Sequence, residues 1–132
     1  MVDASVFVNA AAVDGPTGEA ARRAVQSLSV LEVPAVFPAE VASAVRKMVL
    51  AGVLSEARAR ATLTALVDVA KACHDFEPFI GRVWELRHHL TVYDAWYVAL
   101  AEALDAALLT ADGHLASAPG LRCEVQVVGA AG

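Results

Sequence analysis

Apolar and polar residues alternate with a helical period over most of the chain. Such a period, bounded by capping and turn residues, is typical of amphipathic helices. The pattern predicts helices over residues 18–28, 39–50, 55–71, 78–89 and 91–104. Pro38 stands where a first helical residue belongs and Gly52 follows the end of the same helix, which are the usual places for proline and glycine.

Short apolar runs between the helices predict strands. These runs cover residues 1–3, 32–37, 106–112 and 123–128, and residues 74–77 are a further possible short strand. Periodicity does not decide whether residues 5–8 continue the first strand or begin a helix. Strands that alternate with helices imply an α/β protein, with a mainly parallel sheet covered on both faces. Ligands bind such sheets beyond the carboxyl ends of the strands.

The predicted helix TVYDAWYVALAEAL, over residues 91–104, is apolar almost all the way round, yet it carries Asp94 in its first turn. This acid has two interpretations. The spacing Thr91-x-x-Asp94 matches a capping box, and negative charge suits the start of a helix. Alternatively, Asp94 is a metal ligand mounted on a buried helix. The segment alone leaves both interpretations open.

Composition limits the class of protein. The chain has 132 residues, 58% of them hydrophobic, and a mean hydropathy of +0.53. This length is typical of one domain with a sizeable core. The longest stretch without a charged side chain is the 10 residues 4–13, whereas about 20 are needed to cross a bilayer. We therefore expect a cytoplasmic protein with no membrane-spanning segment and, because Asp3 is acidic, no signal peptide.

Charge and cysteine content narrow the class further. A formal charge of −5 argues against a protein that coats nucleic acid with a broad basic surface. The two cysteines, Cys73 and Cys123, form no Cys-x-x-Cys motif. This arrangement predicts reduced, buried thiols.

Carboxylates fall at the ends of otherwise apolar elements: Asp3, Glu40, Asp94 and Asp112. Each one alone has an ordinary interpretation as a cap, a turn residue or an exposed acid. Together they are harder to explain, because carboxylates are rarely buried unless they are paired or bind a cation. Oxygen ligands suit Mg²⁺ or Mn²⁺, and such a metal supports phosphodiester hydrolysis.

The segments VDASVFV, PAEVASAVRK, LTVYDAWYVALAEALDAALLTAD and GHLA resemble PIN-domain proteins, and more narrowly the VapC-type toxins of bacterial toxin–antitoxin pairs. The resemblance covers nearly the whole chain, and residues 90–112 are its most specific part. It implies one PIN domain over residues 1–132. The implied fold is a three-layer α/β/α sandwich around a mainly parallel sheet of four to five strands.

The resemblance also implies a Mg²⁺- or Mn²⁺-dependent endoribonuclease. Ser5 would steady the Asp3 carboxylate or the water of the site, and Thr110 would do the same beside Asp112. The family's catalytic, metal-binding acids correspond here to Asp3, Glu40, Asp94 and Asp112. The implied partners are a cognate VapB-type antitoxin, an RNA substrate of the tRNA or rRNA class, and a second copy of the chain in a homodimer.

Basic and aromatic side chains give weaker signals. Arg46 and Arg87 are candidates for RNA phosphate contacts because their helices lead toward the acids, although each also fits a solvated helix face. Trp84, Trp96 and Tyr97 could stack on bases, but packing is the competing interpretation, above all for Trp96.

Two other classes of protein remain as alternatives. A phospho-accepting receiver domain has a similar size and acids at strand ends. It should also carry an acid pair after its first strand and a late lysine, whereas Asp3 stands alone and no lysine follows Lys71. A catalytically silent PIN-like binding module would keep the acids without cleaving RNA.

Overall fold

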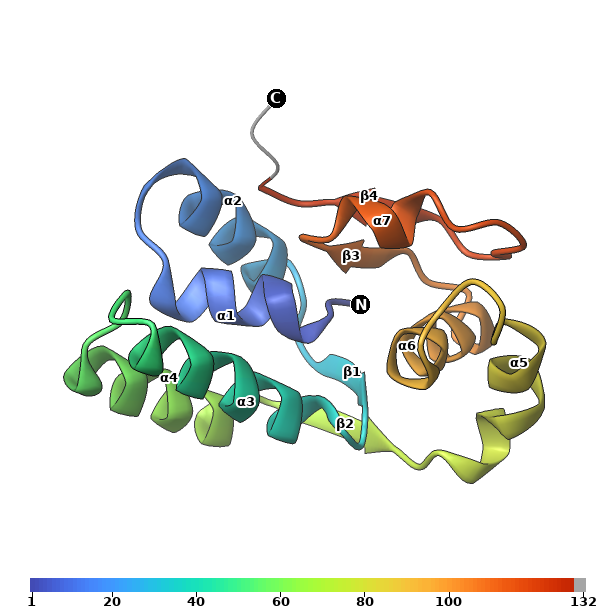
Figure 1. The fold of residues 1–132 in the computed structure, drawn as a ribbon, viewed down its shortest axis with the longest axis horizontal. Helices are drawn as coiled ribbons and strands as arrows, with labels where there is room; N and C mark the ends of the chain where they lie inside the picture. The colour runs from blue at the N-terminus through green and yellow to red at the C-terminus, as the bar shows by residue number, and fades with distance from the viewer. Residues whose placement is uncertain (130–132) are drawn as a thin grey trace.

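Two separate parallel strand pairs lie among the helices of the fold (Figure 1). The computed structural model describes residues 1–129, so residues 130–132 of the expected domain lie outside it. The strands are β1 (Leu31–Pro34), β2 (Lys71–His74), β3 (Leu108–Thr110) and β4 (Val125–Val127). β1 pairs with β2 and β3 pairs with β4, both in parallel, and Val2 adds a parallel bridge to Leu109.

Helices make up most of the rest of the described chain. They are α1 (Ala4–Ala12), α2 (Gly15–Gln26), α3 (Phe37–Leu50), α4 (Glu56–Asp68), α5 (Ile80–Glu85), α6 (Val92–Ala103), α7 (Gly113–Ala116) and the 3₁₀ turn η1 (Glu77–Phe79). α1 packs against α2, α3 and α4 on one side of the molecule, and α5 packs against α6 on the other (Figure 1).

Local sequence signals explain where these helices begin. Asp3 caps α1 by accepting a hydrogen bond from the Val6 N–H, and Ser55 caps α4 in the same way. Thr91 caps α6 through its hydroxyl. Each cap satisfies one of the backbone N–H groups that a helix start leaves without a partner.

The turn between α1 and α2 needs a glycine at position 18. A Cβ on Gly18 would lie 1.7 Å from the Val13 carbonyl oxygen, which is an impossible contact. The same carbonyl accepts a hydrogen bond from Arg22 Nη1 at 3.0 Å, and Arg22 also donates to the Ala10 carbonyl. Arg22 thus ties the end of α1 to α2, and Gly18 lets the two approach.

The helix that the sequence predicts to be apolar all round is buried all round. Every residue of α6 from Ala95 to Ala101 is buried. α6 contacts β1, β3 and α5, so no long face of it is left to solvent. Its partners in the core include fully buried side chains from the strands and other helices: Val2, Val6, Leu31, Val33, Phe37, Val41 and Leu108.

The expected sheet of four to five strands is not present as one continuous sheet. Within residues 1–129 the pairing consists of two separate parallel pairs and the single Val2 bridge. Residues 5–8, which the pattern left undecided, are helical. The reason is that the Asp3 side chain caps α1 one residue after Val2, so the chain turns into a helix before a longer strand can form.

Further predicted boundaries were wrong, among them the end of the strand expected over residues 32–37, since Phe37 already belongs to α3. The strand expected over residues 74–77 lies at Lys71–His74, where Leu31 and Lys71 pair in register. The helix expected over residues 78–89 is broken into η1 and a short α5 that ends at Glu85. Residues 74–77 hold one apolar side chain, Phe76, and therefore give little strand signal, whereas residues 86–89 form turns in place of a further helical turn.

The prediction of buried thiols was wrong for Cys73. This residue is exposed and Cys123 is half-buried, and neither forms a disulfide. β2 pairs with β1 alone in the described chain, so alternate side chains along β2 face outward. In residues 1–129 we find no helix with both the length and the apolar character needed to span a membrane.

A largely buried ion pair joins α5, α6 and the loop before β4. Arg82 Nε donates to Glu102 Oε1 at 2.7 Å, and Arg82 Nη2 also bonds Glu102 and the Gly120 carbonyl. The two side chains are 17% and 11% exposed. The Arg122 N–H adds a further bond to Glu102 at 2.7 Å.

Replacing Arg82 by Met should therefore destabilise the protein by about 2 kcal/mol, because Glu102 would keep its charge in a poorly solvated place with only one backbone donor. Urea denaturation measures the effect. Arg60→Met is the matched control, because the Arg60–Glu56 pair is 78% and 69% exposed and should contribute no more than about 0.5 kcal/mol. Equal effects of the two substitutions would contradict this interpretation of the Arg82 pair.

Candidate active site

Asp3 is the most firmly held of the expected metal ligands. It lies between the Val2 bridge and the first turn of α1, and it is 9% exposed. Asp3 Oδ1 accepts hydrogen bonds from Ser5 Oγ at 2.5 Å and from Val6 N at 3.2 Å, and Oδ2 accepts one from Thr110 Oγ1 at 2.5 Å. Donors from α1 and β3 therefore fix the orientation of this carboxylate.

Ser5 and Thr110 also connect Asp3 to the segment after β3. Ser5 Oγ accepts a hydrogen bond from Ala111 N at 3.0 Å, and Thr110 Oγ1 accepts one from Asp112 N at 3.0 Å. Asp112 is exposed, and its Oδ1 caps α7 by accepting from His114 N at 2.9 Å. The structure thus places Ser5 on Asp3, and Thr110 between Asp3 and Asp112.

Glu40 and Asp94 each lie in the first turn of a helix, α3 and α6, and each is half-buried. The capping interpretation of Thr91 is confirmed, because Thr91 Oγ1 accepts a hydrogen bond from Asp94 N at 3.1 Å. This bond uses the backbone of Asp94. The cap therefore does not need the Asp94 carboxylate, and the two interpretations of that residue are compatible.

The charges of these acids act on one another. Burial raises the pKa of Glu40; the nearby Tyr97 hydroxyl opposes this, and the negative charges of Asp94 and Asp3 raise the pKa further. Burial also raises the pKa of Asp94, and the charges of Asp112 and Asp3 add to that effect. The fold thus brings four acids from four separate segments into one electrostatic neighbourhood.

No basic side chain neutralises this cluster in the described part of the chain. The ion pairs found there involve other acids, namely Asp14, Glu32, Glu56, Glu85 and Glu102. Within residues 1–129, no group of three or more His, Cys, Asp or Glu side chains is arranged closely enough to hold a metal ion. Binding of an ion by these acids therefore requires their side chains to move together.

The acids nevertheless fit a hard divalent cation. Glu40 Oε1 is buried and has no hydrogen-bond partner, which is costly for a carboxylate oxygen. The atoms of the cluster that could bind a metal ion are carboxylate and hydroxyl oxygens, with no sulfur or imidazole among them. Mg²⁺ and Mn²⁺ prefer such oxygen ligands, and either ion would offset the mutual repulsion of the acids.

The two arginines that we expected at RNA phosphates are both exposed. Arg87 lies over the Trp84 ring at 5.0 Å and donates from Nη1 to the Trp84 carbonyl at 2.7 Å. Trp84 is 61% exposed. Trp96, in contrast, is buried in edge-to-face contact with Phe76, so the packing interpretation of Trp96 is confirmed.

Sequence reasoning considered Tyr97 only for base stacking or packing and missed its position beside Glu40. Its side chain is 2% exposed, and its hydroxyl lies beside Glu40, close enough for each group to shift the pKa of the other. The available signal was the spacing of three residues from Asp94, which puts both side chains on one face of the helix.

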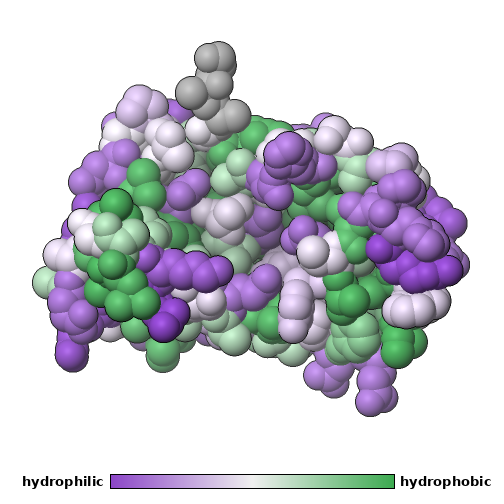
Figure 2. Space-filling model, in the orientation of Figure 1, coloured by the Kyte–Doolittle hydropathy of each residue, from purple (hydrophilic) through white to green (hydrophobic). Residues whose placement is uncertain are grey.

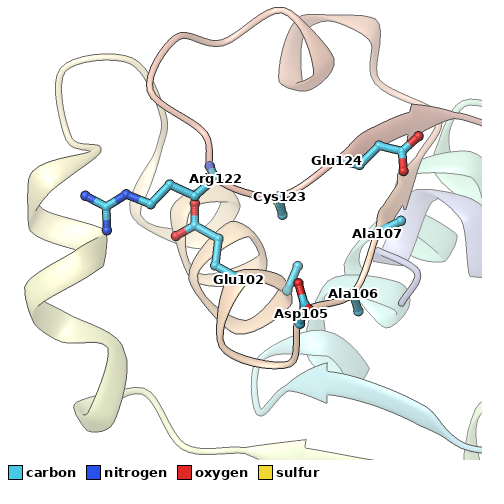
Figure 3. A pocket seen from close by; sticks show the side chains of 8 residues that line it. Glu102, Asp105, Ala106, Ala107, Arg122, Cys123 and Glu124 are labelled. Atoms are coloured by element: carbon cyan, nitrogen blue, oxygen red, sulfur yellow. Dashed lines mark hydrogen bonds between the residues drawn. The ribbon is translucent and has the colours of Figure 1, made fainter.

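A separate cavity of about 170 Å³ lies at the opposite end of β3 and β4 (Figure 3). Its lining residues include Glu102, Asp105 and Glu124, together with Cys123 on the segment just before β4. Glu102 is already bonded to Arg82 and to the Arg122 backbone. This cavity therefore does not belong to the cluster around Asp3.

The fold and the site define an α/β protein with unneutralised carboxylates beyond its parallel strands. The family model for the PIN domain matches residues 1–121. The chain is 43% identical over 129 residues to ribonuclease VapC1 of Mycobacterium tuberculosis, covering 97% of this chain and 96% of the relative. Ribonuclease VapC9 of the same organism is 36% identical over 130 residues, with 97% of each chain covered. The chain therefore belongs to the PIN-domain family and, within it, to the VapC group.

The raised pKa values of Glu40 and Asp94 have a consequence for the metal-free protein. A carboxyl whose pKa is raised by folding holds its proton in the folded state at pH values where the unfolded chain has lost it. Its contribution to stability is therefore complete below its unfolded pKa, near 4, and is lost as the pH rises through the folded pKa.

Asp94→Asn should accordingly stabilise the metal-free protein at pH 7, and the gain should shrink as the pH falls toward 4. Denaturation curves in the presence of a chelator at several pH values measure this. Asp14→Asn is the control of opposite sign, because the bond to Arg58 lowers the pKa of Asp14 and its charge favours folding. A loss of stability at pH 7 in Asp94→Asn would show that the cluster does not repel itself.

Proposed function

We propose that this protein is a Mg²⁺- or Mn²⁺-dependent endoribonuclease, a VapC-type toxin that hydrolyses RNA phosphodiester bonds in the cytoplasm. The observation that carries the proposal is the acid cluster, in which burial and the neighbouring negative charges raise the pKa of Glu40 and of Asp94 and which no described base neutralises. Membership of the VapC group supports the same activity, since the relatives are named ribonucleases.

The residues of the cluster would have distinct roles. Asp3 offers a carboxylate already fixed by three hydrogen bonds, and Ser5 and Thr110 are the positioning residues that fix it. Asp94 extends from the first turn of a helix that is buried from Ala95 to Ala101, so its backbone has a rigid mount. Asp112 is exposed beyond β3, where its carboxylate would be a further ligand for the ion on the side open to the substrate. A bound ion would supply an activated water and stabilise charge on the leaving oxygen.

Contacts outside the acids would hold the RNA. Arg46 and Arg87 are exposed and positively charged, which suits contacts to phosphates. We assign the substrate to the tRNA or rRNA class on the resemblance to VapC-type toxins. Phosphate contacts position a chain without reading its sequence, so the choice of RNA rests on the shape of the surface.

An apolar surface supports the proposed protein partners. Leu50 and Val53, at the turn between α3 and α4, are each 69% exposed, and Val67 on α4 is 75% exposed. Hydrophobic side chains gather over this turn at the left of Figure 2. Exposed patches of this kind mark protein interfaces. We propose a cognate VapB-type antitoxin and a second copy of this chain in a homodimer as the partners.

Of the alternatives, the silent PIN-like binding module remains the second candidate, because an intact acid set does not prove turnover. The receiver domain is not supported, since the chain belongs to the PIN-domain family.

Asp94→Asn and Asp3→Asn should each slow RNA cleavage by at least about 100-fold, because each removes a charged ligand from the site. The measurement is cleavage of total tRNA and rRNA by purified protein with Mg²⁺ or Mn²⁺, followed by mapping of the new RNA ends. Asp94→Asn should fold normally, since the cap bond comes from the backbone of that residue.

Two control variants separate chemistry from stability. Thr91→Ala should lower the free energy of unfolding by about 1 kcal/mol through loss of the cap, yet retain cleavage below its melting temperature. Asp105→Asn removes an exposed acid outside the cluster and should change neither property. Full activity in Asp94→Asn would contradict the proposed site, and a wild-type protein that cleaves no RNA with any divalent ion would favour the silent module.

A further inference from the structure

Two buried polar atoms beside the acid cluster have no hydrogen-bond partner. They are the Tyr97 hydroxyl on α6 and Glu40 Oε1 on α3. The two groups lie close enough to shift each other's pKa, although no bond of normal geometry joins them. A buried polar group left unpaired is destabilising, so two complementary ones side by side call for a functional explanation.

The two groups are chemically complementary. A phenol keeps its proton at neutral pH and can donate it in a hydrogen bond, and burial next to Glu40 raises the pKa of Tyr97 further. A carboxylate oxygen accepts. Asp3 and Asp112 differ from Glu40 in this respect, since Asp3 already accepts three hydrogen bonds and Asp112 accepts one from His114 N.

Tyr97 also has a rigid mount. It lies one turn after Asp94 on the same face of α6, and the helix around it is buried from Ala95 to Ala101. Its hydroxyl therefore holds a fixed position relative to the Asp94 carboxyl. Glu40 has a longer, more flexible side chain with more rotamers to restrain.

We propose that Tyr97 is a positioning residue, whose hydroxyl donates a hydrogen bond to Glu40 and holds that carboxylate ready for the divalent cation. This inference rests on the proposed function, because it assigns Tyr97 to the same metal site. Partners of this kind, which bond a metal ligand rather than the metal, typically change metal affinity by about 10- to 100-fold when they are removed.

The test is the affinity of the protein for Mn²⁺, measured by isothermal titration calorimetry on Tyr97→Phe and the wild type. Tyr97→Phe should bind Mn²⁺ about tenfold more weakly. The melting temperature of the metal-free protein should not fall, because the lost hydroxyl had no partner there. Tyr93→Phe is the matched control: it makes the same chemical change on the same helix, at a side chain that is 55% exposed, and it should bind as the wild type does.

A double substitution identifies the residue through which Tyr97 acts. In a Glu40→Ala background, adding Tyr97→Phe should weaken Mn²⁺ binding no further. Three results would each overturn the inference while leaving the proposed nuclease intact. They are an equal loss of Mn²⁺ affinity in both backgrounds, wild-type Mn²⁺ affinity in Tyr97→Phe, and a loss of affinity that merely follows a lower melting temperature of the metal-free protein. A wild-type protein that binds neither Mg²⁺ nor Mn²⁺ would instead overturn the proposed function, and the role of Tyr97 with it.

Discussion

The hydrogen bonds on the Asp3 carboxylate are the interaction on which the site depends. They start α1, join that helix to the end of β3 through Thr110, and limit the first strand to the single Val2 bridge. A charged group at 9% exposure is costly unless donors surround it, and here Ser5, Val6 and Thr110 provide them. The same bonds that make this acid tolerable also fix its direction.

Glu40 and Asp94 differ from Asp3, because their environment destabilises the charged carboxylate. Burial and mutual repulsion raise the pKa of both Glu40 and Asp94, so their charges oppose folding in the absence of a cation. The fold tolerates them because large apolar elements, above all α6, pack around them. Functional sites are where proteins most often depart from the arrangement that stability alone would favour.

Much of the layout was accessible from the pattern of residues, and the errors have identifiable causes. α6 was predicted almost to the residue, because a long apolar run with a threonine cap has few alternatives. The acids were found because they fall just after apolar runs. Strand positions were less certain: β2 lies three residues before the expected start, since strand register depends on the partner β1 rather than on local sequence. The position of Tyr97 beside Glu40 was missed because a buried tyrosine resembles a core residue until its neighbours are known.

The sequence by itself determined the family and the longer helices, such as α3, α4 and α6, and it singled out four candidate acids, because these follow from local periodicity, from capping residues and from motifs that are contiguous in the chain. Only the tertiary structure decided that Thr110 bonds to Asp3, that the Asp94 backbone rather than its carboxylate makes the cap, and that Tyr97 lies beside Glu40. These are contacts between segments far apart in sequence, or choices between two atoms of one residue. Both depend on how helices and strands pack in space, which no local pattern specifies.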